Sequence, residues 1–274
     1  MKIYAGFIAM LLVSTGLVSA QSAAVLIGGR STGMGNASAA LADSWAVYNN
    51  PAGATELKNA AVSTTCATHV ELTGADRIAA LLAIPTGAGT FSAGAFSFGD
   101  NVYSEQLLSA GYCNSLGLAA MGIRVDYIQY KAEGFETAAA FGVTLGTIAK
   151  ITSKLSLGCY VANVNRPRLP NGQALPVRMA AGFAFRPAEK IVMCAELEKD
   201  VDFPATFKGG LEISPLKKVK LRSGFNLYPN AAYGGIGLKA WRIDLDYSVS
   251  FNPALSYAHQ ATLSFLAKSK NAKK

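Results

Sequence analysis

The sequence predicts an all-β protein, a transmembrane antiparallel β-barrel of about 14 strands with a short N-terminal helical plug. Hydrophobic residues make up 51% of the chain and charged residues only 15%, against about 25% charged in a typical soluble domain. After residue 20 no uninterrupted apolar run reaches the length of about 18 residues that a spanning helix needs. From Lys58 onward, segments of about ten residues alternate between apolar and polar positions. Since only helices and closed barrels satisfy their backbone hydrogen bonds within lipid, these features predict a barrel.

The first 20 residues have the features of a signal peptide. Lys2 supplies the positive charge, Phe7 to Leu17 form the apolar run, and Val18-Ser19-Ala20 provides a small-residue cleavage site. We expect cleavage after Ala20 and export from the cytoplasm. The domain organisation that follows is a signal peptide over 1–20, a plug over 21–57, a barrel over 58–266 and a basic tail over 267–274.

The predicted strands are bounded by Gly, Pro, Asn and Asp, which favour turns. They cover residues 58–68, 76–84, 89–99, 102–113, 116–130, 135–148, 151–165, 175–187, 190–199, 206–214, 217–227, 232–240, 241–250 and 257–266. The alternation is clearest over 241–250, where odd positions are apolar or aromatic and even positions are polar. In a membrane barrel the apolar face contacts lipid and the polar face lines the lumen.

The predicted connections also differ in length between the two ends of the barrel. The even-numbered ones are short, as at 85–88 and 114–115, and several others are longer, as at 69–75 and 166–174. Short periplasmic turns and longer outer loops are typical of bacterial outer-membrane barrels, so we expect the bacterial cell outer membrane as the location and its lipid as a partner. A soluble β-sandwich or propeller is the alternative, but the low charge and the lack of a blade-length repeat argue against it.

The formal charge of +8 gives little information about partners. Lys2 is removed with the signal peptide, and four lysines crowd the last seven residues, which leaves about +3 on the barrel. We therefore expect no nucleic-acid partner. The four cysteines, Cys66, Cys113, Cys159 and Cys194, stand singly in predicted strands. We interpret them as apolar filling, although four cysteines could also pair in three ways.

Residues that could carry catalysis are sparse, and the sequence predicts neither an enzyme nor a cofactor or metal site. The two histidines, His69 and His259, stand apart. Gly29 to Gly33 match G-x-S-x-G, but a nucleophile elbow needs an α/β sheet that this chain lacks, so we interpret the match as chance.

Two carboxylate pairs, Asp244 with Asp246 and Glu196 with Glu198, each share one strand face. They could form acid–base pairs. We favour a lumenal charge ladder in which they neutralise basic residues of neighbouring strands, because a polar lumen needs mixed charge. The basic residues expected in this ladder are Lys218, Lys220, Arg222, Arg242 and Arg178.

The N-terminal stretch GMGNASAALADSWAVYNNPAG, from Gly33 to Gly53, predicts a short helix that ends at an Asn-Asn-Pro turn. Gly33 and Gly35 permit close backbone approach, and Pro51 disfavours helix at Asn50 and turns the chain toward the first strand. The alternative is an amphipathic helix on the surface. The structural motif that we expect to fix the plug consists of Gly33, Gly35, Asp43, Tyr48, Asn50, Pro51 and Gly53.

This stretch resembles the N-terminus of the PorV/PorQ family, which belongs with the FadL-type outer-membrane barrels. The resemblance rests on the small residues around Gly33-Met34-Gly35, on Ala42-Asp43 and on Asn50-Pro51-Ala52-Gly53. It extends more weakly to 212–215, 221–225, 234–238, 243–247 and 259–265. It implies that the segment folds as a plug within a fourteen-stranded barrel.

The resemblance also implies two functions. The first is a non-enzymatic component or accessory of type IX protein secretion, with a translocon or exported cargo as protein partner. The second is a FadL-like passive transporter of small hydrophobic molecules across the outer membrane. The plug has few Phe or Leu residues, which favours the protein partner over a hydrophobic small molecule.

Overall fold

The computed structural model describes residues 26–267. The predicted signal peptide (1–20), residues 21–25 of the predicted plug and residues 268–274 of the predicted basic tail lie outside the described residues. Within residues 26–267 no helix has both the length and the apolar character needed to cross a bilayer.

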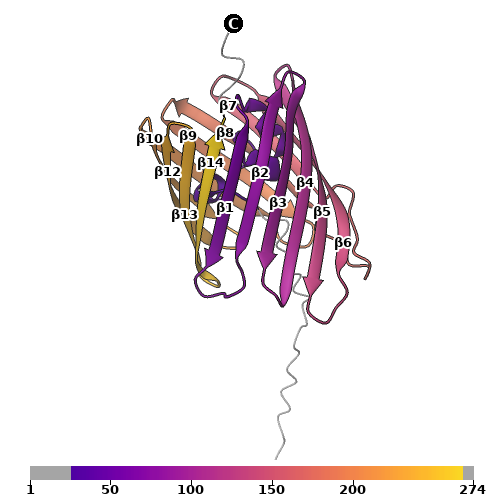
Figure 1. The fold of residues 1–274 in the computed structure, drawn as a ribbon. Coiled ribbons are helices and arrows are strands. Elements are labelled where there is room, and N and C mark those ends of the chain that lie inside the picture. Colours follow the sequence, from indigo (N-terminus) through magenta and orange to yellow (C-terminus); the bar gives the residue numbers. More distant parts are fainter. Residues whose placement is uncertain (1–25, 268–274) are drawn as a thin grey trace, which may run out of the picture.

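Fourteen antiparallel strands form a closed barrel (Figure 1), which confirms the predicted fold class. Each strand pairs with its neighbours in the chain, and β1 closes the ring against β14. The strands are β1 (Ala61–His69), β2 (Arg77–Thr86), β3 (Gly89–Gly99), β4 (Tyr103–Leu116), β5 (Ala119–Ala132), β6 (Ala138–Lys150), β7 (Leu155–Ala162), β8 (Arg178–Ala188), β9 (Ile191–Asp200), β10 (Thr206–Leu216), β11 (Val219–Asn226), β12 (Ala231–Ala240), β13 (Ile243–Asn252) and β14 (Ser256–Leu266).

The seventh strand is shorter than the predicted 151–165. The Thr152 hydroxyl accepts hydrogen bonds from the backbone N–H groups of Lys154 and Leu155, which holds 151–154 in a turn. At the other end Asn163 has φ 56°, a left-handed conformation that ends the strand. A local side-chain contact therefore replaces strand pairing at the first end, and a left-handed backbone conformation ends the strand at the second.

The connections alternate in length, as predicted. One rim of the barrel, here called the turn edge, carries short connections at 87–88, 117–118 and 217–218. The opposite rim, the loop edge, carries several longer ones, including 70–76 and 163–177. In Figure 1 the turn edge is at the top, together with the C-terminal end of β14.

The two faces of the wall follow the predicted alternation. In β13 the side chains of Ile243, Leu245 and Tyr247 are about two-fifths exposed on the outer face. Asp244 and Asp246 alternate with them and face the interior. The barrel interior buries ionisable side chains, namely Glu105, Arg124, Asp126, Glu196, Lys208, Glu212 and Arg222. An apolar exterior around a polar interior is the reverse of a soluble β-protein and typical of a membrane barrel.

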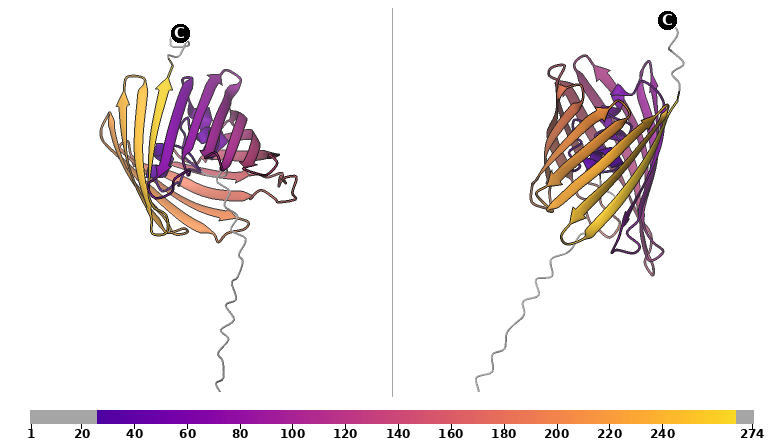
Figure 2. Two further views of the ribbon diagram at one scale, coloured as in Figure 1. Left: turned by 60° about the horizontal axis from the view of Figure 1, so that its bottom comes forward. Right: turned by 90° about the vertical axis from the view of Figure 1, so that its left-hand side faces the viewer.

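The N-terminal segment lies inside the ring of strands (Figure 2). It contains α1 (Gly29–Gly33), α2 (Ala46–Asn49) and a 3-10 helix, η1 (Pro51–Glu56), rather than the single predicted helix. Asn50 is extended as expected, but Pro51 starts η1 instead of leading directly into the first strand. A proline at the first helical position needs no N–H partner, so it suits a helix start. The surface-helix alternative is wrong, because nearly all of the segment is buried.

The connection between β7 and β8 folds inward. Leu169 and Leu175 are 6% and 2% exposed and belong to the same apolar cluster as Ile27 and Val47 of the plug. Leu175 N–H donates to the Pro167 carbonyl, and a bridge between Arg168 and Ala174 makes the connection a small hairpin. The sequence predicted only one of the longer outer connections here, at 166–174; in the structure this connection contributes to the barrel's interior packing.

Candidate functional site: the plugged lumen

The seven residues of the predicted plug motif all lie inside the barrel, but the structure does not gather them into one chemical centre. They fix the plug at separate places. Gly33 and Gly35 approach the wall at β10, β11 and β12. Tyr48 faces β3, Asn50 faces β6 and Pro51 faces β5. The other two motif residues make contacts within the plug itself, Asp43 with Arg30 and Gly53 with Leu41.

Gly35 meets both conditions that require glycine. Its φ of 67° is left-handed, and a Cβ atom there would lie 2.7 Å from the Gly209 carbonyl oxygen of the wall. A larger residue would be strained by its conformation and would also collide with the barrel. Gly53 is fixed by contact alone, since a Cβ atom would lie 2.5 Å from the Leu41 carbonyl oxygen.

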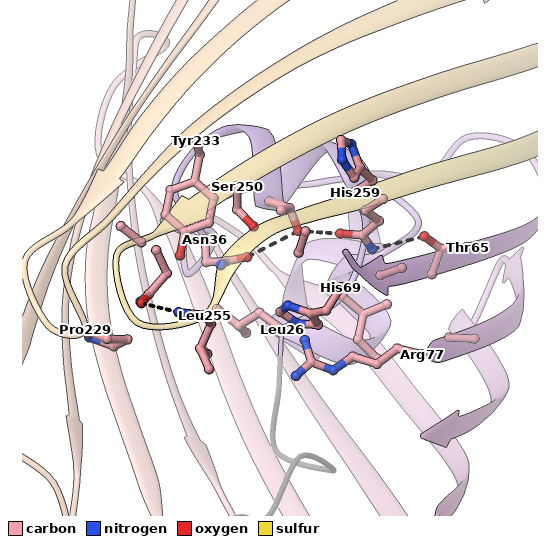
Figure 3. Close-up of a pocket in the computed structure, with 18 of the residues that line it drawn as sticks. Leu26, Asn36, Thr65, His69, Arg77, Pro229, Tyr233, Ser250, Leu255 and His259 are labelled. Carbon is pink, nitrogen blue, oxygen red and sulfur yellow. Dashed lines mark hydrogen bonds between the residues drawn. The ribbon is translucent and has the colours of Figure 1, made fainter. Parts of the chain in front are cut away.

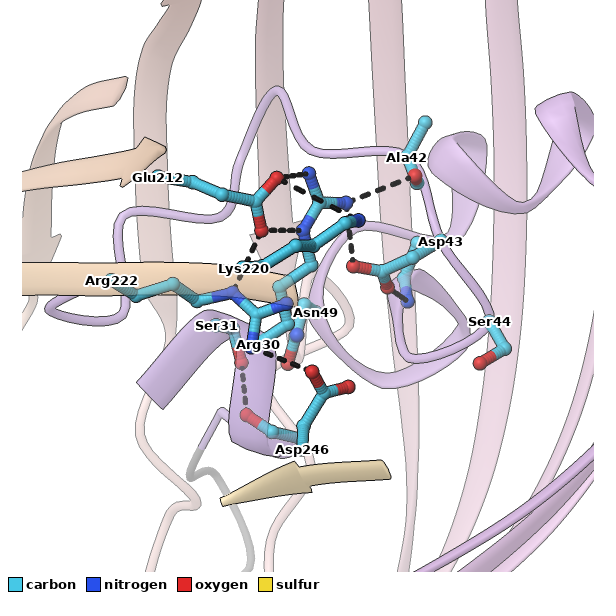
Figure 4. A network of polar contacts seen from close by, with 12 residues as sticks. Arg30, Ser31, Ala42, Asp43, Ser44, Asn49, Glu212, Lys220, Arg222 and Asp246 are labelled. Carbon is cyan, nitrogen blue, oxygen red and sulfur yellow. Dashed lines mark hydrogen bonds and ion pairs between the residues drawn. The ribbon is translucent and has the colours of Figure 1, made fainter. Parts of the chain in front are cut away.

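A first anchor joins α1 to β10, β11 and β13 through buried ions (Figure 4). Arg30 donates from Nε and Nη2 to the two carboxylate oxygens of Glu212, both at 2.9 Å. Its Nη1 lies 3.3 Å from Asp43 Oδ2. Arg222 Nε donates to Glu212 at 2.7 Å, and its Nη1 donates to Asp246 at 2.6 Å. Because each buried charge has an opposite charge in contact, the network avoids the large cost of an isolated buried ion.

A second anchor holds the turn after α1. The buried Glu196 carboxylate of β9 accepts the backbone N–H groups of Ser38 and Ala39 at 2.8 and 2.7 Å. Lys208 of β10 lies 3.1 Å from Glu196 and 2.8 Å from Glu198. Backbone N–H groups bonded to a carboxylate form strong, charge-assisted hydrogen bonds, so the wall supplies the partners that the plug backbone lacks.

A third anchor holds the end of α2. Arg124 of β5 donates from Nη1 to the Val47 carbonyl at 3.0 Å and also to the Tyr48 carbonyl. Its Nε lies 2.8 Å from Asp126, which also accepts from Ser109 at 2.6 Å. The last carbonyls of a helix have no partner within the helix, and a cation near them is favourable.

Asn50 is fully buried at the corner between α2 and η1. Its Nδ2 donates to the Ala39 carbonyl at 2.5 Å and to the wall carbonyl of Thr147 at 3.1 Å. Two wall glycines make room for this corner: a Cβ atom on Gly146 would lie 2.0 Å from Asn50 Oδ1, and one on Gly158 would lie 2.0 Å from the Ala39 oxygen. Glycine within a strand often marks such a close backbone approach.

A cavity of about 230 Å³ remains between the plug and the loop edge (Figure 3). Its apolar lining includes Leu26 and Ile27 of the plug together with Ala79 and Phe96 of the wall. Polar side chains complete the lining, among them Thr32, Thr65, His69, Arg77, Tyr233 and Gln260. The cavity is therefore of mixed character, with an apolar portion and a set of polar groups, as in many sites for small molecules.

A second hollow, of about 320 Å³, lies across β2 to β5. Outward-facing Ile78, Leu108 and Tyr127 contribute to its lining. Ile78, Ala79 and Phe96 also line the inner cavity. The two spaces thus approach each other from opposite sides of the wall at β2 and β3.

The Ser31 hydroxyl of the G-x-S-x-G match donates within its own turn, to the Gly28 carbonyl at 2.9 Å or the Ile27 carbonyl at 3.1 Å, and is buried. No group of three metal-ligating side chains occurs within residues 26–267. The four cysteines are free thiols, Cys66 and Cys159 exposed and Cys113 and Cys194 buried.

The structure contains part of the charge ladder that the sequence predicted for the lumen. Asp246 pairs with Arg222, and Glu198 lies 3.5 Å from Arg178. Among the residues that the structure describes, Lys218 and Arg242 form no ion pair. The anchoring roles of Arg30, Glu212 and Arg124 were not predicted from the sequence, although one signal was available. Each is an ionisable residue at an inward position of the alternation or within the apolar plug.

Comparison with solved structures identifies the fold. The toluene transporter TbuX of Ralstonia pickettii aligns with a TM-score of 0.67 at 12% identity, over 87% of this chain and 97% of that one. The toluene transporter TodX of Pseudomonas putida aligns with a TM-score of 0.67 at 14% identity, over 87% of this chain and 97% of that one. A FadL homologue of Pseudomonas aeruginosa aligns with a TM-score of 0.62 at 10% identity, over 86% of this chain and 97% of that one. No protein-family model matches the chain, and no curated protein matches it in sequence. The chain therefore has the fold of the FadL-type barrels.

Proposed function

We propose that this chain is a non-enzymatic barrel of the bacterial outer membrane through which small hydrophobic molecules cross passively. The observation that carries the proposal is the filled lumen. The plug occupies the space that an open porin would leave to water, and the inner cavity of about 230 Å³ at the loop edge lies beside a hollow on the outer face. A hydrophilic solute has no wide aqueous path in such an interior, whereas a small apolar molecule has a compartment of its own size.

The membrane location is supported by the outer face of the wall. Large apolar side chains project outward from strand after strand, as Val62, Leu82, Phe183, Leu221 and Leu263 do, each at least two-fifths exposed. A soluble protein rarely exposes such a continuous apolar surface. The longer connections at the loop edge support placing that edge outside the cell.

The path that we propose begins at the loop edge, passes through the cavity and leaves through the wall between β2 and β3. Ala79 and Phe96 line both the cavity and the outer hollow. The wall is hydrogen-bonded along these strands, from Arg77–Phe98 to Thr86–Gly89. Passage therefore requires local movement of side chains or of this strand pair. The named neighbours agree with the proposal, since two of them are described as toluene transporters.

Uptake of radiolabelled toluene by vesicles that contain the purified protein tests the proposal. We expect faster uptake than in protein-free vesicles, slower uptake for Ala79→Leu and faster uptake for Phe96→Ala. Ala93→Leu, an outward position on β3 away from both spaces, is the matched control and should behave as the unmodified protein. Uptake that no variant alters, or that equals the protein-free rate, would overturn the proposal.

The role in type IX secretion stays a prediction of the PorV/PorQ resemblance. None of the described contacts favours it over hydrocarbon passage. Affinity purification from outer membranes in mild detergent separates the two functions, because a secretion accessory should retain a translocon or exported cargo. A transporter should purify without them.

A further inference from the structure

Two polar atoms at the cavity of the loop edge, Arg77 Nε and His69 Nδ1, are buried without a hydrogen-bond partner among the described residues. Much of the polar lining is satisfied internally. Thr32 donates to Gln260 Oε1 at 2.6 Å, and Gln260 Nε2 donates to Thr65 at 3.0 Å. Thr65 in turn shares a hydrogen bond with Thr262 at 2.6 Å. These groups of the plug, β1 and β14 therefore offer a ligand little that is not already bonded.

Arg77 and His69 differ from that side of the cavity. Within residues 26–267 the Nε of the Arg77 guanidinium is buried and has no hydrogen-bond partner. Its charged group lies 5.6 Å from the centre of the Phe98 ring. His69 Nδ1 is likewise buried and unpartnered. Figure 3 shows both side chains near Leu26, on the same side of the cavity.

Such an arrangement is costly while it stays unsatisfied. A buried donor without an acceptor loses its hydrogen bonds to water and gains nothing in return. A pure hydrocarbon in the cavity would leave Arg77 and His69 in that condition. A ligand with an acceptor oxygen would satisfy the guanidinium, which has several N–H groups and no acceptor of its own. The buried Glu105 carboxylate offsets part of the Arg77 charge, so a neutral acceptor suits the site as well as an anionic one.

The cavity also limits the size of the ligand. An engineered apolar cavity of about 150 Å³ holds one benzene molecule, and this cavity measures about 230 Å³. It therefore has room for one ring with a short substituent. The apolar portion, formed by Leu26, Ile27, Ala79 and Phe96, would contact the ring, and the substituent would face Arg77 and His69.

We infer that the cavity selects a one-ring ligand that carries an acceptor oxygen at one end, of the aromatic ketone or aromatic carboxylate class, with the oxygen toward Arg77 and His69. This inference rests on the proposed function and narrows its substrate class from hydrophobic molecules in general to oxygen-bearing aromatic ones.

Equilibrium dialysis of the purified full chain in detergent, with radiolabelled acetophenone, benzoate and toluene in turn, tests the inference. We expect acetophenone or benzoate to bind roughly tenfold more tightly than toluene, the difference made by one hydrogen bond to a charged donor. Arg77→Met should remove this preference and leave toluene binding unchanged. Lys131→Met, which removes an exposed cation near the loop edge away from the cavity, should leave all three affinities unchanged.

Two further variants guard against a folding defect, with heat-dependent migration on gels as the check that the barrel is intact. Arg77→Lys keeps the charge and loses the fork of donors, and His69→Phe removes the imidazole, whose Nδ1 can donate when it carries the proton. Each variant should weaken acetophenone binding more than toluene binding. Equal affinity for toluene and the two oxygen-bearing ligands, or a preference that survives Arg77→Met, overturns the inference while the proposed function stands. Absence of toluene uptake in the vesicle assay overturns the proposed function itself.

Discussion

Arg30 of the plug and Glu212 of β10 form a two-point ion pair inside the barrel, with both N···O distances at 2.9 Å. The two residues are far apart in the sequence, and this contact joins the N-terminal segment to the second half of the wall. Two further anchors, at Glu196 and Arg124, hold other parts of the plug. Closure of the lumen is therefore a property of wall and plug together.

Loss of this ion pair should loosen the plug. Glu212→Gln removes the negative charge that lies between the Arg30 and Arg222 cations. We therefore expect the free energy of unfolding to fall by about 3 kcal/mol, as is typical when one partner of a buried ion pair is removed. Planar-bilayer recordings should then show ion conductance that the unmodified protein lacks. The double variant Arg30→Met/Glu212→Met should be less destabilised than Glu212→Met alone, because Arg222 keeps Asp246. Equal destabilisation would contradict a specific coupling between the two residues.

The wall glycines should be essential for plug docking. A Cβ atom on Gly146 would lie 2.0 Å from Asn50 Oδ1, so Gly146→Ala should displace the corner of the plug. Gly234→Ala is the matched control on β12, since its Cβ atom would meet nothing closer than Val249 at 3.8 Å. We expect a lower thermal midpoint and measurable conductance for Gly146→Ala only. Similar behaviour of both variants would contradict the docking role.

Asn50 should tolerate alanine better than aspartate. Its Nδ2 donates to carbonyl oxygens of Ala39 and Thr147, and Asn50→Asp would replace that donor with an anion facing the same oxygens. Loss of the hydrogen bonds in Asn50→Ala should lower the free energy of unfolding by about 1–3 kcal/mol. The buried unpaired charge in Asn50→Asp should lower it further. Thermal unfolding at neutral pH measures both. An aspartate variant as stable as the alanine variant would show that these carbonyls do not depend on the amide.

The cysteines provide a test of which face of each strand meets lipid. Cys66 and Cys159 are exposed on the outer face, and Cys113 and Cys194 are buried. In intact proteoliposomes an apolar maleimide should label Cys66 and Cys159, while a charged, membrane-impermeant thiol reagent should label none of the four. Mass spectrometry after digestion identifies the labelled thiols. Labelling of Cys113 or Cys194 by the apolar reagent before denaturation would contradict the strand registers.

The fold could be predicted from the sequence because its determinants are local. Alternation such as that of 241–250 fixes the two faces of a strand, and turn residues mark the strand ends, so most predicted strands lie within a few residues of those observed. The seventh strand was predicted too long, because the Thr152 turn depends on hydrogen bonds that apolar periodicity does not reveal. The three short helices of the plug were likewise predicted as one, since the wall rather than helix propensity holds them.

A closed antiparallel barrel with an apolar exterior, preceded by a glycine-containing segment of unusual composition, can be inferred from the sequence alone. Strand periodicity and backbone conformation act over a few residues and can be followed along the chain. Three features are visible only in the folded chain: Glu212 meets Arg30, Gly146 admits Asn50, and a buried, unpartnered nitrogen of Arg77 and one of His69 lie at the same cavity. Those contacts join residues far apart in the chain, and closure of the ring around the plug is the physical event that brings them together.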